Sequence, residues 1–247
     1  MANSEDLAGG DPAGYQAVEA QVGSHASRLN SLRAAVLGAN DGIVSTAGIV
    51  IGVAGATLVP FAILTAGIAG LTAGALSMAV GEYVSVSAQR DTEKALLDKE
   101  RRELEEMPEE ELAELAGLYE AKGLDSALAL QVAIQLHAHD ALAAHAETEL
   151  GIDPDELTNP WAAALSSAVS FTVGSILPLL AIMIVPTSLK VIVTVAAVAA
   201  ALVLTGFLSA RAGGTSHTRS IIRNVAGGLL AMAVTYGIGR LVGHTLG

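Results

Sequence analysis

The sequence contains no cysteine, and this absence removes several kinds of chemistry. Because none of the 247 residues is cysteine, a disulfide framework, a thiolate metal site and thiol catalysis are all excluded. Aromatic residues are also scarce, at 3% of the chain. The apolar part of the sequence therefore consists of Ala, Val, Leu, Ile and Gly, and its small residues let membrane helices approach one another closely.

Charged residues are few and unevenly distributed. They make up 15% of the chain against 52% hydrophobic residues, and the mean hydropathy is +0.53. This balance is too apolar for an ordinary soluble domain and indicates a membrane protein. Of the 25 acidic residues, 19 lie between Asp91 and Glu156, and none follows Glu156. The chain is thus two apolar blocks separated by an acidic insert, and its scattered basic residues are too few to indicate nucleic-acid binding.

Five apolar segments are long enough to cross the roughly 30 Å hydrocarbon layer of a membrane at about 1.5 Å per helical residue. The sequence therefore predicts an all-α integral membrane protein with five transmembrane helices and a cytosolic three-helix acidic insert between the second and third spans. The predicted spans are Arg33–Ala56, Leu58–Val84, Trp161–Ile184, Ser188–Ala210 and Ile221–Val242.

The orientation follows from the basic residues, which accumulate on the cytoplasmic side of membrane proteins. With the N-terminus inside, only Lys190 and Arg240 of the 13 Lys and Arg residues lie outside. The N-terminus and the insert are therefore predicted to be cytosolic. The first residues lack the pattern of a signal peptide and are interpreted as a disordered tail. The predicted divisions are a tail at 1–30, transmembrane helices at 31–90, the insert at 91–158 and transmembrane helices at 159–247.

The insert carries start and stop signals for three helices. The helix of the second span has no break signal until Pro108, which suits the first turn of a second helix. Asp125 or Ser126 can cap a third helix. This third helix is expected to run to Leu150, with Gly151 at its C-terminal end.

Two carboxylates fall within the apolar spans, Asp41 in GANDGIV and Glu82 in SMAVGEYVS. A carboxylate in hydrocarbon is costly and usually faces a cavity or a partner, which makes both candidates for an ion pathway. On the second span Gly70, Gly74, Met78 and Glu82 recur every four residues and share one face. The candidate pathway is therefore Asp41, Met78 and Glu82. The alternatives are a helix-pairing role for Asp41, a packing role for Met78 and contact of Glu82 with the membrane boundary.

Carboxylates also recur on single helix faces within the insert. The break at Pro108 is expected to fold two of these faces toward each other, and carboxylates with an imidazole suit divalent ions such as Mn²⁺ and Fe²⁺. The alternative is that these residues form only a solvated face. The candidate metal ligands are Glu100, Glu103, Glu111, Glu114, His145 and Glu149.

Other site types find no support in the sequence. No Glu has His three residues later, which argues against a diiron carboxylate enzyme. An EF-hand loop, a P-loop and a dinucleotide fingerprint are also missing. His137 and His139 are two residues apart, on different faces of a helix, and the spacing assigns no role to either of them.

Two stretches stand out as unusual: GANDGIVSTAGIVIGVAGA in the first span and LTAGALSMAVGEYVSVSAQRD in the second. They are followed by an acidic insert that ends in ELGI and by three closing spans. With its parts in this order, the chain resembles the vacuolar iron transporter family, which includes nodulin-like and bacterial members. The resemblance covers nearly everything after residue 28.

The resemblance implies a homodimer of five-span subunits that exports Fe²⁺ and related divalent ions from the cytosol in exchange for protons. It places the pathway between the first two helices of the two subunits, where the family's acid falls on Asp41 and its methionine on Met78. The glutamates that the family uses to bind metal in the cytosol fall on Glu100, Glu103, Glu111, Glu114 and Glu149.

Two departures from the family pattern bear on the ion that is carried. A glutamate found in the second span of plant members corresponds to Gly70, and Glu82 lies too far along the helix to replace it, although it suits the entrance of the pathway. Where plant members have a methionine pair in the insert, this chain has His145 and Ala146. A nitrogen ligand in place of sulfur is expected to shift the metal preference.

The sequence thus predicts a transporter without enzymatic activity or a prosthetic group. Its predicted partners are membrane lipid, protons, a second copy of the chain and Fe²⁺, with Mn²⁺, Co²⁺ and Zn²⁺ as further ions. The Ala- and Gly-rich composition favours the plasma membrane of a prokaryote, with a vacuolar membrane as the alternative. Two other hypotheses stay open: a membrane-anchored metal sensor without transport, and a transporter of another solute.

Overall fold

The computed structural model describes residues 35–155 and 157–246, and every regular element in this part of the chain is a helix. The expected tail at 1–30 lies outside the described residues. Contacts divide the chain into two compact units. The membrane unit contains the residues up to 79 and from 165 onward, and the insert unit contains residues 80–164.

Within the described ranges, five helices are long and apolar enough to cross a membrane. This confirms the five predicted spans, and the chain is a multi-pass membrane protein. Helix α2 has 47 residues, or about 70 Å at about 1.5 Å per residue. Since this is about twice the hydrocarbon thickness, the second half of α2 extends beyond the membrane, as predicted. The five helices are Ala35–Ala56, α2 (Pro60–Glu106), α5 (Pro160–Ile184), α6 (Lys190–Ala212) and α7 (His217–Leu246).

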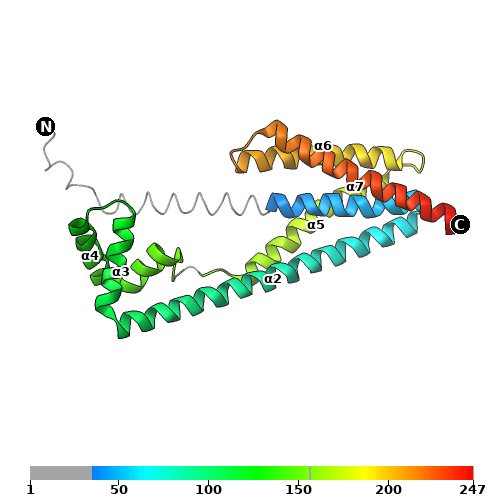
Figure 1. Cartoon of the computed structure of the whole chain (residues 1–247). Helices are drawn as coiled ribbons and strands as arrows, with labels where there is room; N and C mark the ends of the chain where they lie inside the picture. The colour runs from blue at the N-terminus through cyan, green and yellow to red at the C-terminus, as the bar shows by residue number, and fades with distance from the viewer. Residues whose placement is uncertain (1–34, 156, 247) are drawn as a thin grey trace. The chain divides into compact units, whose positions relative to one another are not determined.

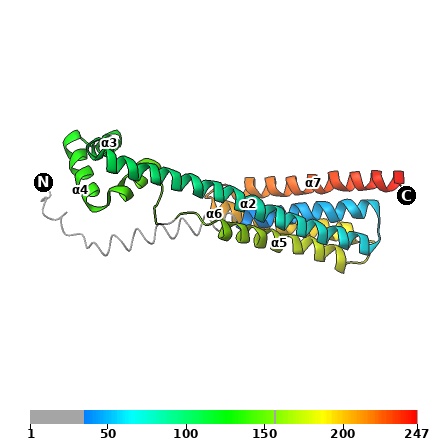
Figure 2. The same cartoon turned by 90° about the horizontal axis from the view of Figure 1, so that it is seen from below.

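The Ala35–Ala56 helix lies at the centre of the membrane unit, beside α5, α6 and α7 (Figure 1, Figure 2). Its glycines and alanines allow very close contacts, as expected for helices that pair in lipid. A Cβ atom at Gly239 of α7 would lie 1.8 Å from the carbonyl oxygen of Gly52. A Cβ atom at Gly174 of α5 would lie 2.0 Å from the carbonyl oxygen of Ala39. The buried core around this helix comprises Ile43, Ala47, Val50, Ile51, Ala54, Ile63, Ile182, Val198, Leu202 and Met232.

The insert unit contains the end of α2, followed by α3 (Pro108–Ala121), α4 (Ser126–His145) and the short π-helix η1 (Ala146–Leu150). Helix α3 begins at Pro108, as the sequence predicts. The carboxylate of Asp125 accepts hydrogen bonds from the backbone N–H groups of Ala127 and Leu128, which confirms the predicted cap of α4. The small core between α3 and α4 consists of Leu115, Ala116, Ala133 and Ala144, with Leu112, Tyr119 and Leu136 around them.

The prediction of a single third insert helix that runs to Leu150 is wrong. Asp140 has φ −156° and ψ 99°, so the helix stops there and restarts. Its carboxylate accepts a hydrogen bond of 2.9 Å from the backbone N–H of Ala143, which makes Asp140 the cap of the new segment. The restarted helix ends in η1, and Gly151 follows in the left-handed conformation with φ 64°. The break matters because the restarted segment carries His145 and Glu149.

The close contact between α7 and the Ala35–Ala56 helix generates a paired test. Gly239→Ala would force the two backbones apart, and we expect it to destabilise the protein by about 1–3 kcal/mol. Gly237→Ala is the matched control, because a Cβ atom at Gly237, on the same helix, would meet nothing within 4 Å. The measurement is the thermal midpoint of the purified protein in detergent. Equal midpoints for the two variants would contradict the close contact.

Candidate metal centre

Three helices of the insert unit each bring one side chain to a common point: Glu100 from α2, Glu111 from α3 and His145 from α4. Their candidate ligand atoms all lie within 4.8 Å of one another. The Nδ1 atom of His145 lies 3.0 Å from Oε1 of Glu100 and 3.7 Å from Oε2 of Glu111. Two carboxylates and an imidazole at this separation can converge on one divalent ion.

These three side chains are buried to a degree that is unusual for ionisable groups. His145 is 0% exposed, Glu100 2% and Glu111 5%. Although Nδ1 of His145 and Oε1 of Glu100 lie 3.0 Å apart, they are not aligned as a hydrogen bond, and among the described residues neither these two atoms nor Nε2 of His145 has a hydrogen-bond partner. Buried polar atoms are nearly always paired, because leaving them unpaired is costly. The cluster is therefore an arrangement that a bound cation would stabilise.

The electrostatics of the cluster agree with this interpretation. Burial raises the pKa of Glu100 to about 7, and the carboxylates of Glu149, Glu111 and Glu103 add to the shift. Burial also raises the pKa of Glu111, again with help from neighbouring carboxylates. Burial lowers the pKa of His145, which favours the neutral imidazole that binds metal. Metal binding near neutral pH would therefore compete with a proton at Glu100 and would not have to displace one from the histidine.

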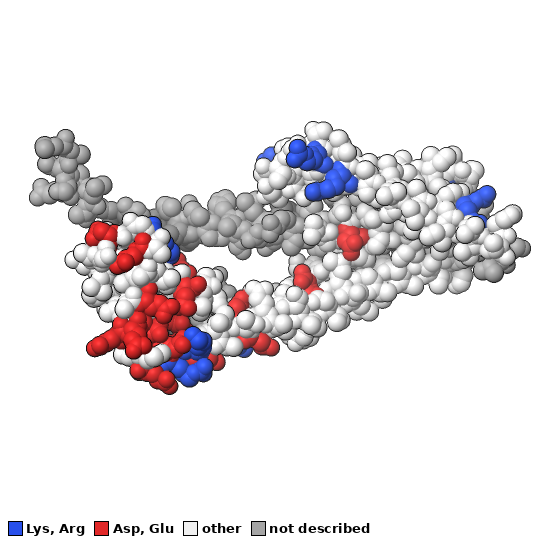
Figure 3. All heavy atoms as spheres, viewed as in Figure 1, with Lys and Arg blue, Asp and Glu red and all other residues white. Residues whose placement is uncertain are grey.

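The remaining predicted ligands of the insert lie at the edge of this cluster. Oε2 of Glu149 lies 4.0 Å from Nδ1 of His145, and burial raises the pKa of Glu149 as well. Glu103 forms an ion pair with Lys99 on α2. Glu114 is exposed, and its charge contributes to the raised pKa values of Glu111 and Glu149. Acidic side chains gather over the insert on the face shown in Figure 3.

The candidate pathway residues fall in both units. In the membrane unit, Asp41 is exposed on the Ala35–Ala56 helix, and Ser45 donates a hydrogen bond of 2.6 Å to its backbone carbonyl. Met78 is half-buried on α2. Glu82 belongs to the insert unit and is exposed. The ring of its neighbour Tyr83 lies with its centroid 4.7 Å from that of Trp161, and the two ring planes are tilted by 53°.

Gly70 and Gly74, which share a face of α2 with Met78 and Glu82, do not line an opening. A Cβ atom at Gly70 would lie 2.3 Å from Cδ1 of Ile49, and one at Gly74 would lie 2.2 Å from Cζ of Phe171. Both glycines therefore pack against other helices of the same chain. At the position where the family resemblance implies a glutamate in plant members, Ile49 fills the space beside Gly70.

Two polar features of the structure were missed by the sequence analysis. Oδ1 of Asn40 accepts hydrogen bonds from Oγ1 of Thr205 at 3.0 Å and from Nδ2 of Asn224 at 3.3 Å. The sequence signal that could have identified this feature is the side-chain amide of Asn40, which lies beside Asp41 in an apolar span. The second feature is His137, whose ring lies with its centroid 6.0 Å from that of His145. No spacing rule pairs these two histidines, because the break at Asp140 lies between them.

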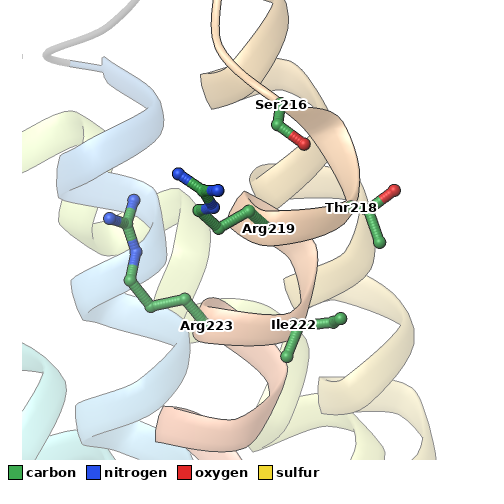
Figure 4. Close-up of a pocket in the computed structure, with 5 residues that line it drawn as sticks. All are labelled: Ser216, Thr218, Arg219, Ile222 and Arg223. Atoms are coloured by element: carbon green, nitrogen blue, oxygen red, sulfur yellow. The ribbon is translucent and has the colours of Figure 1, made fainter.

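A hollow of about 480 Å³ also lies at the start of α7. It is lined by Ser216, Thr218, Arg219, Ile222 and Arg223, and the two arginines extend to the same side of the helix (Figure 4). Two guanidinium groups without a lining carboxylate repel a divalent cation. This hollow is therefore not a second metal centre.

The fold and the centre together define a class: helical multi-pass membrane proteins with a cluster of carboxylates and imidazole in a hydrophilic insert. Within that class the sequence identifies one family, because the family profile described as "VIT family" matches residues 32–240. The chain belongs to the VIT family, and the family resemblance seen in the sequence is confirmed.

Curated relatives match along most of their length. A protein of Acanthamoeba castellanii named "Vacuolar iron transporter" is 44% identical over 231 residues, which cover 92% of this chain and 85% of the relative. "Vacuolar iron transporter homolog 1" of Oryza sativa subsp. japonica is 38% identical over 221 residues, or 89% of this chain and 77% of the relative. "Vacuolar iron transporter homolog 2" of Arabidopsis thaliana is 34% identical over 226 residues, or 91% of each chain.

The raised pKa of Glu100 predicts a pH dependence of the metal-free insert. Between its ordinary value of 4.5 and about 7, the folded chain keeps a proton that the unfolded chain has released. Stability is therefore expected to fall as the pH rises through this range. The measurement is hydrogen exchange of the α3 and α4 amides on the full chain in detergent with a chelator. After correction for the intrinsic exchange rate, these amides should exchange faster at the higher pH.

Two variants show whether Glu100 causes this dependence. Glu100→Gln cannot titrate and should remove the contribution of Glu100 to the slope, leaving those of Glu111, Glu149 and His145, while Glu110→Gln, at an exposed position of α3, should leave the profile unchanged. If Glu100→Gln and the wild type showed the same slope between about pH 5 and 7.5, the raised pKa of Glu100 would be contradicted.

Proposed function

We propose that this protein transports divalent transition-metal ions, Fe²⁺ and also Mn²⁺, out of the cytosol in exchange for protons. The observation that carries the proposal is the buried centre of Glu100, Glu111 and His145. It occurs in a chain of the VIT family, whose relatives are named iron transporters. Family membership supports metal transport, and the centre supports divalent ions as the cargo.

The donor set of the insert favours particular ions. Carboxylate oxygens suit hard cations, and an imidazole nitrogen adds affinity for borderline ones, so Fe²⁺ and Mn²⁺ are the best matches, with Co²⁺ and Zn²⁺ as further cargo. The 19 acidic residues between Asp91 and Glu156 also create a negative field that raises the local concentration of cations. The insert would gather ions from the cytosol and deliver them to the pathway.

Within the membrane the proposed pathway uses Asp41 and Met78, with Glu82 at its entrance. Asp41 is exposed in the single chain, and a carboxylate that faces lipid in a membrane span is costly. A second copy of the chain would cover Asp41, which supports a homodimer with the pathway between its subunits. The same carboxylate can bind either a metal ion or a proton, so a proton arriving from the far side would release the ion.

Replacement of the acid in the first span tests the coupling. Asp41→Asn keeps the size of the side chain but removes its charge. We expect it to lower Fe²⁺ and Mn²⁺ flux into proteoliposomes by at least about tenfold and to abolish the accompanying pH change, because an amide cannot exchange a metal for a proton. The assay follows metal uptake and internal pH in the same vesicles.

Controls in the same assay separate this proposal from its rivals. Glu109→Gln, at an exposed position of α3, should match the wild type, while Glu100→Gln should raise the metal concentration needed for half-maximal flux. Unchanged proton-coupled flux in Asp41→Asn would contradict the coupling role. Metal binding without any flux would indicate a sensor instead of a transporter.

The cytosolic location of the insert can be tested by labelling, because the chain has no native cysteine. Glu110→Cys and Thr187→Cys place single thiols at exposed positions of the insert and of the turn between α5 and α6. In intact cells, a membrane-impermeant maleimide is expected to label Thr187→Cys only. Glu110→Cys should react after permeabilisation. The reverse pattern would contradict the orientation inferred from the basic residues.

A further inference from the structure

The two nitrogens of the His145 ring face different surroundings. Nδ1 faces carboxylates, at 3.0 Å from Glu100, 3.7 Å from Glu111 and 4.0 Å from Glu149. Nε2 is buried and has no hydrogen-bond partner among the described residues. If a metal ion is held by the carboxylates, Nδ1 is the nitrogen that binds it.

Binding through Nδ1 has a chemical consequence for the other nitrogen. A neutral imidazole carries one proton, so a ring that gives its Nδ1 lone pair to a metal must carry that proton on Nε2. Histidines that bind metal almost always donate this second N–H to an acceptor, which fixes the tautomer and the ring orientation. The buried Nε2 of His145 therefore requires an acceptor nearby.

His137 offers one. Its Nδ1 atom is also buried and has no hydrogen-bond partner among residues 35–155 and 157–246. The two rings are arranged edge to face at 75°, with their centroids 6.0 Å apart. The two nitrogens form no direct hydrogen bond, and one bridging water can join polar atoms on neighbouring rings that lack a direct contact. Two unpaired buried nitrogens on neighbouring rings are thus explained by a single interaction.

We propose that His137 is a positioning residue for the metal centre: it accepts the Nε2–H of His145 through one water and so holds Nδ1 toward Glu100 and Glu111. This inference rests on the proposed role of the insert in binding metal. It also gives the break at Asp140 a purpose, since the two histidines lie on opposite sides of it in α4. The cap at Asp140 sets the angle at which the His145 segment approaches His137.

The test uses the full chain in lipid nanodiscs, labelled with ¹⁵N-histidine, and Zn²⁺ as a diamagnetic probe. In the wild type, the ring nitrogen shifts of His145 are expected to show metal on Nδ1 and the proton on Nε2, with His145→Leu identifying the signal. His137→Leu removes the acceptor and should weaken Zn²⁺ affinity about 10–100-fold. It should also broaden or change the tautomer signature of His145.

Two further variants separate positioning from simple loss of structure. His137→Gln keeps an acceptor oxygen and should recover part of the Zn²⁺ affinity. If His137→Leu does not fold, the affinity and the His145 tautomer in His137→Gln serve as the test of the positioning role. His139→Leu, at an exposed position two residues away, should behave like the wild type. Wild-type affinity and tautomer in both His137 variants would overturn the inference, as would metal bound on Nε2.

The same experiment distinguishes failure of this inference from failure of the proposed function. Glu100→Gln removes a proposed metal ligand. If it leaves Zn²⁺ affinity unchanged, the cluster is not the metal-binding site and the gathering role of the insert fails. If Glu100→Gln weakens binding while the His137 variants do not, the metal centre stands and only the positioning role of His137 is wrong.

Discussion

A buried imidazole that faces two buried carboxylates is the contact on which the insert depends. Glu100, Glu111 and His145 come from three different helices, so the position of each helix affects the geometry of the cluster. Desolvation and mutual repulsion make the ionised carboxylates unfavourable, and the core of Leu115 and a few alanines beside them is small. A cation that binds only the folded insert would therefore stabilise its fold.

The membrane unit is organised by a different constraint, the need of helices in lipid to pack closely without a hydrophobic driving force. Glycine contacts join the Ala35–Ala56 helix to α5 and α7. Two neighbouring residues of this helix then have contrasting surroundings. Asn40 is hydrogen-bonded to Thr205 and Asn224 within the unit, whereas Asp41 is exposed. The chain thus satisfies the amide oxygen of Asn40 within the membrane unit, while the neighbouring carboxylate is exposed.

Features with strong local causes could be predicted from the sequence. The five spans follow from hydropathy and length, and the start of α3 at Pro108 follows from the ring of proline. The cap at Asp125 was found as well. The second cap, at Asp140, was not, because an Asp within an Ala-rich helical stretch fits an exposed helix position equally well. Local signals of this kind cannot tell a break from a solvated turn.

Which of the glutamates in the insert are buried in the metal cluster could not be predicted from the sequence either. Residues three apart share a helix face, so spacing ranks Glu100 with Glu103 and Glu111 with Glu114. Packing of the insert helices then buries Glu100 of α2 and Glu111 of α3 and leaves Glu114 exposed. His137 approaches His145 only because the helix breaks between them, and Gly70 meets Ile49 only through packing of two spans. These are tertiary effects that no single-helix pattern contains.

The central claim is that an ion entering from the cytosol is first held by Glu100, Glu111 and His145. X-ray absorption at the metal edge tests this most directly, on the full chain loaded with one equivalent of Fe²⁺ or Mn²⁺. We expect a shell of oxygen and nitrogen neighbours with the multiple scattering of an imidazole, and loss of that scattering in His145→Leu. An all-oxygen shell that is the same in both proteins would contradict it.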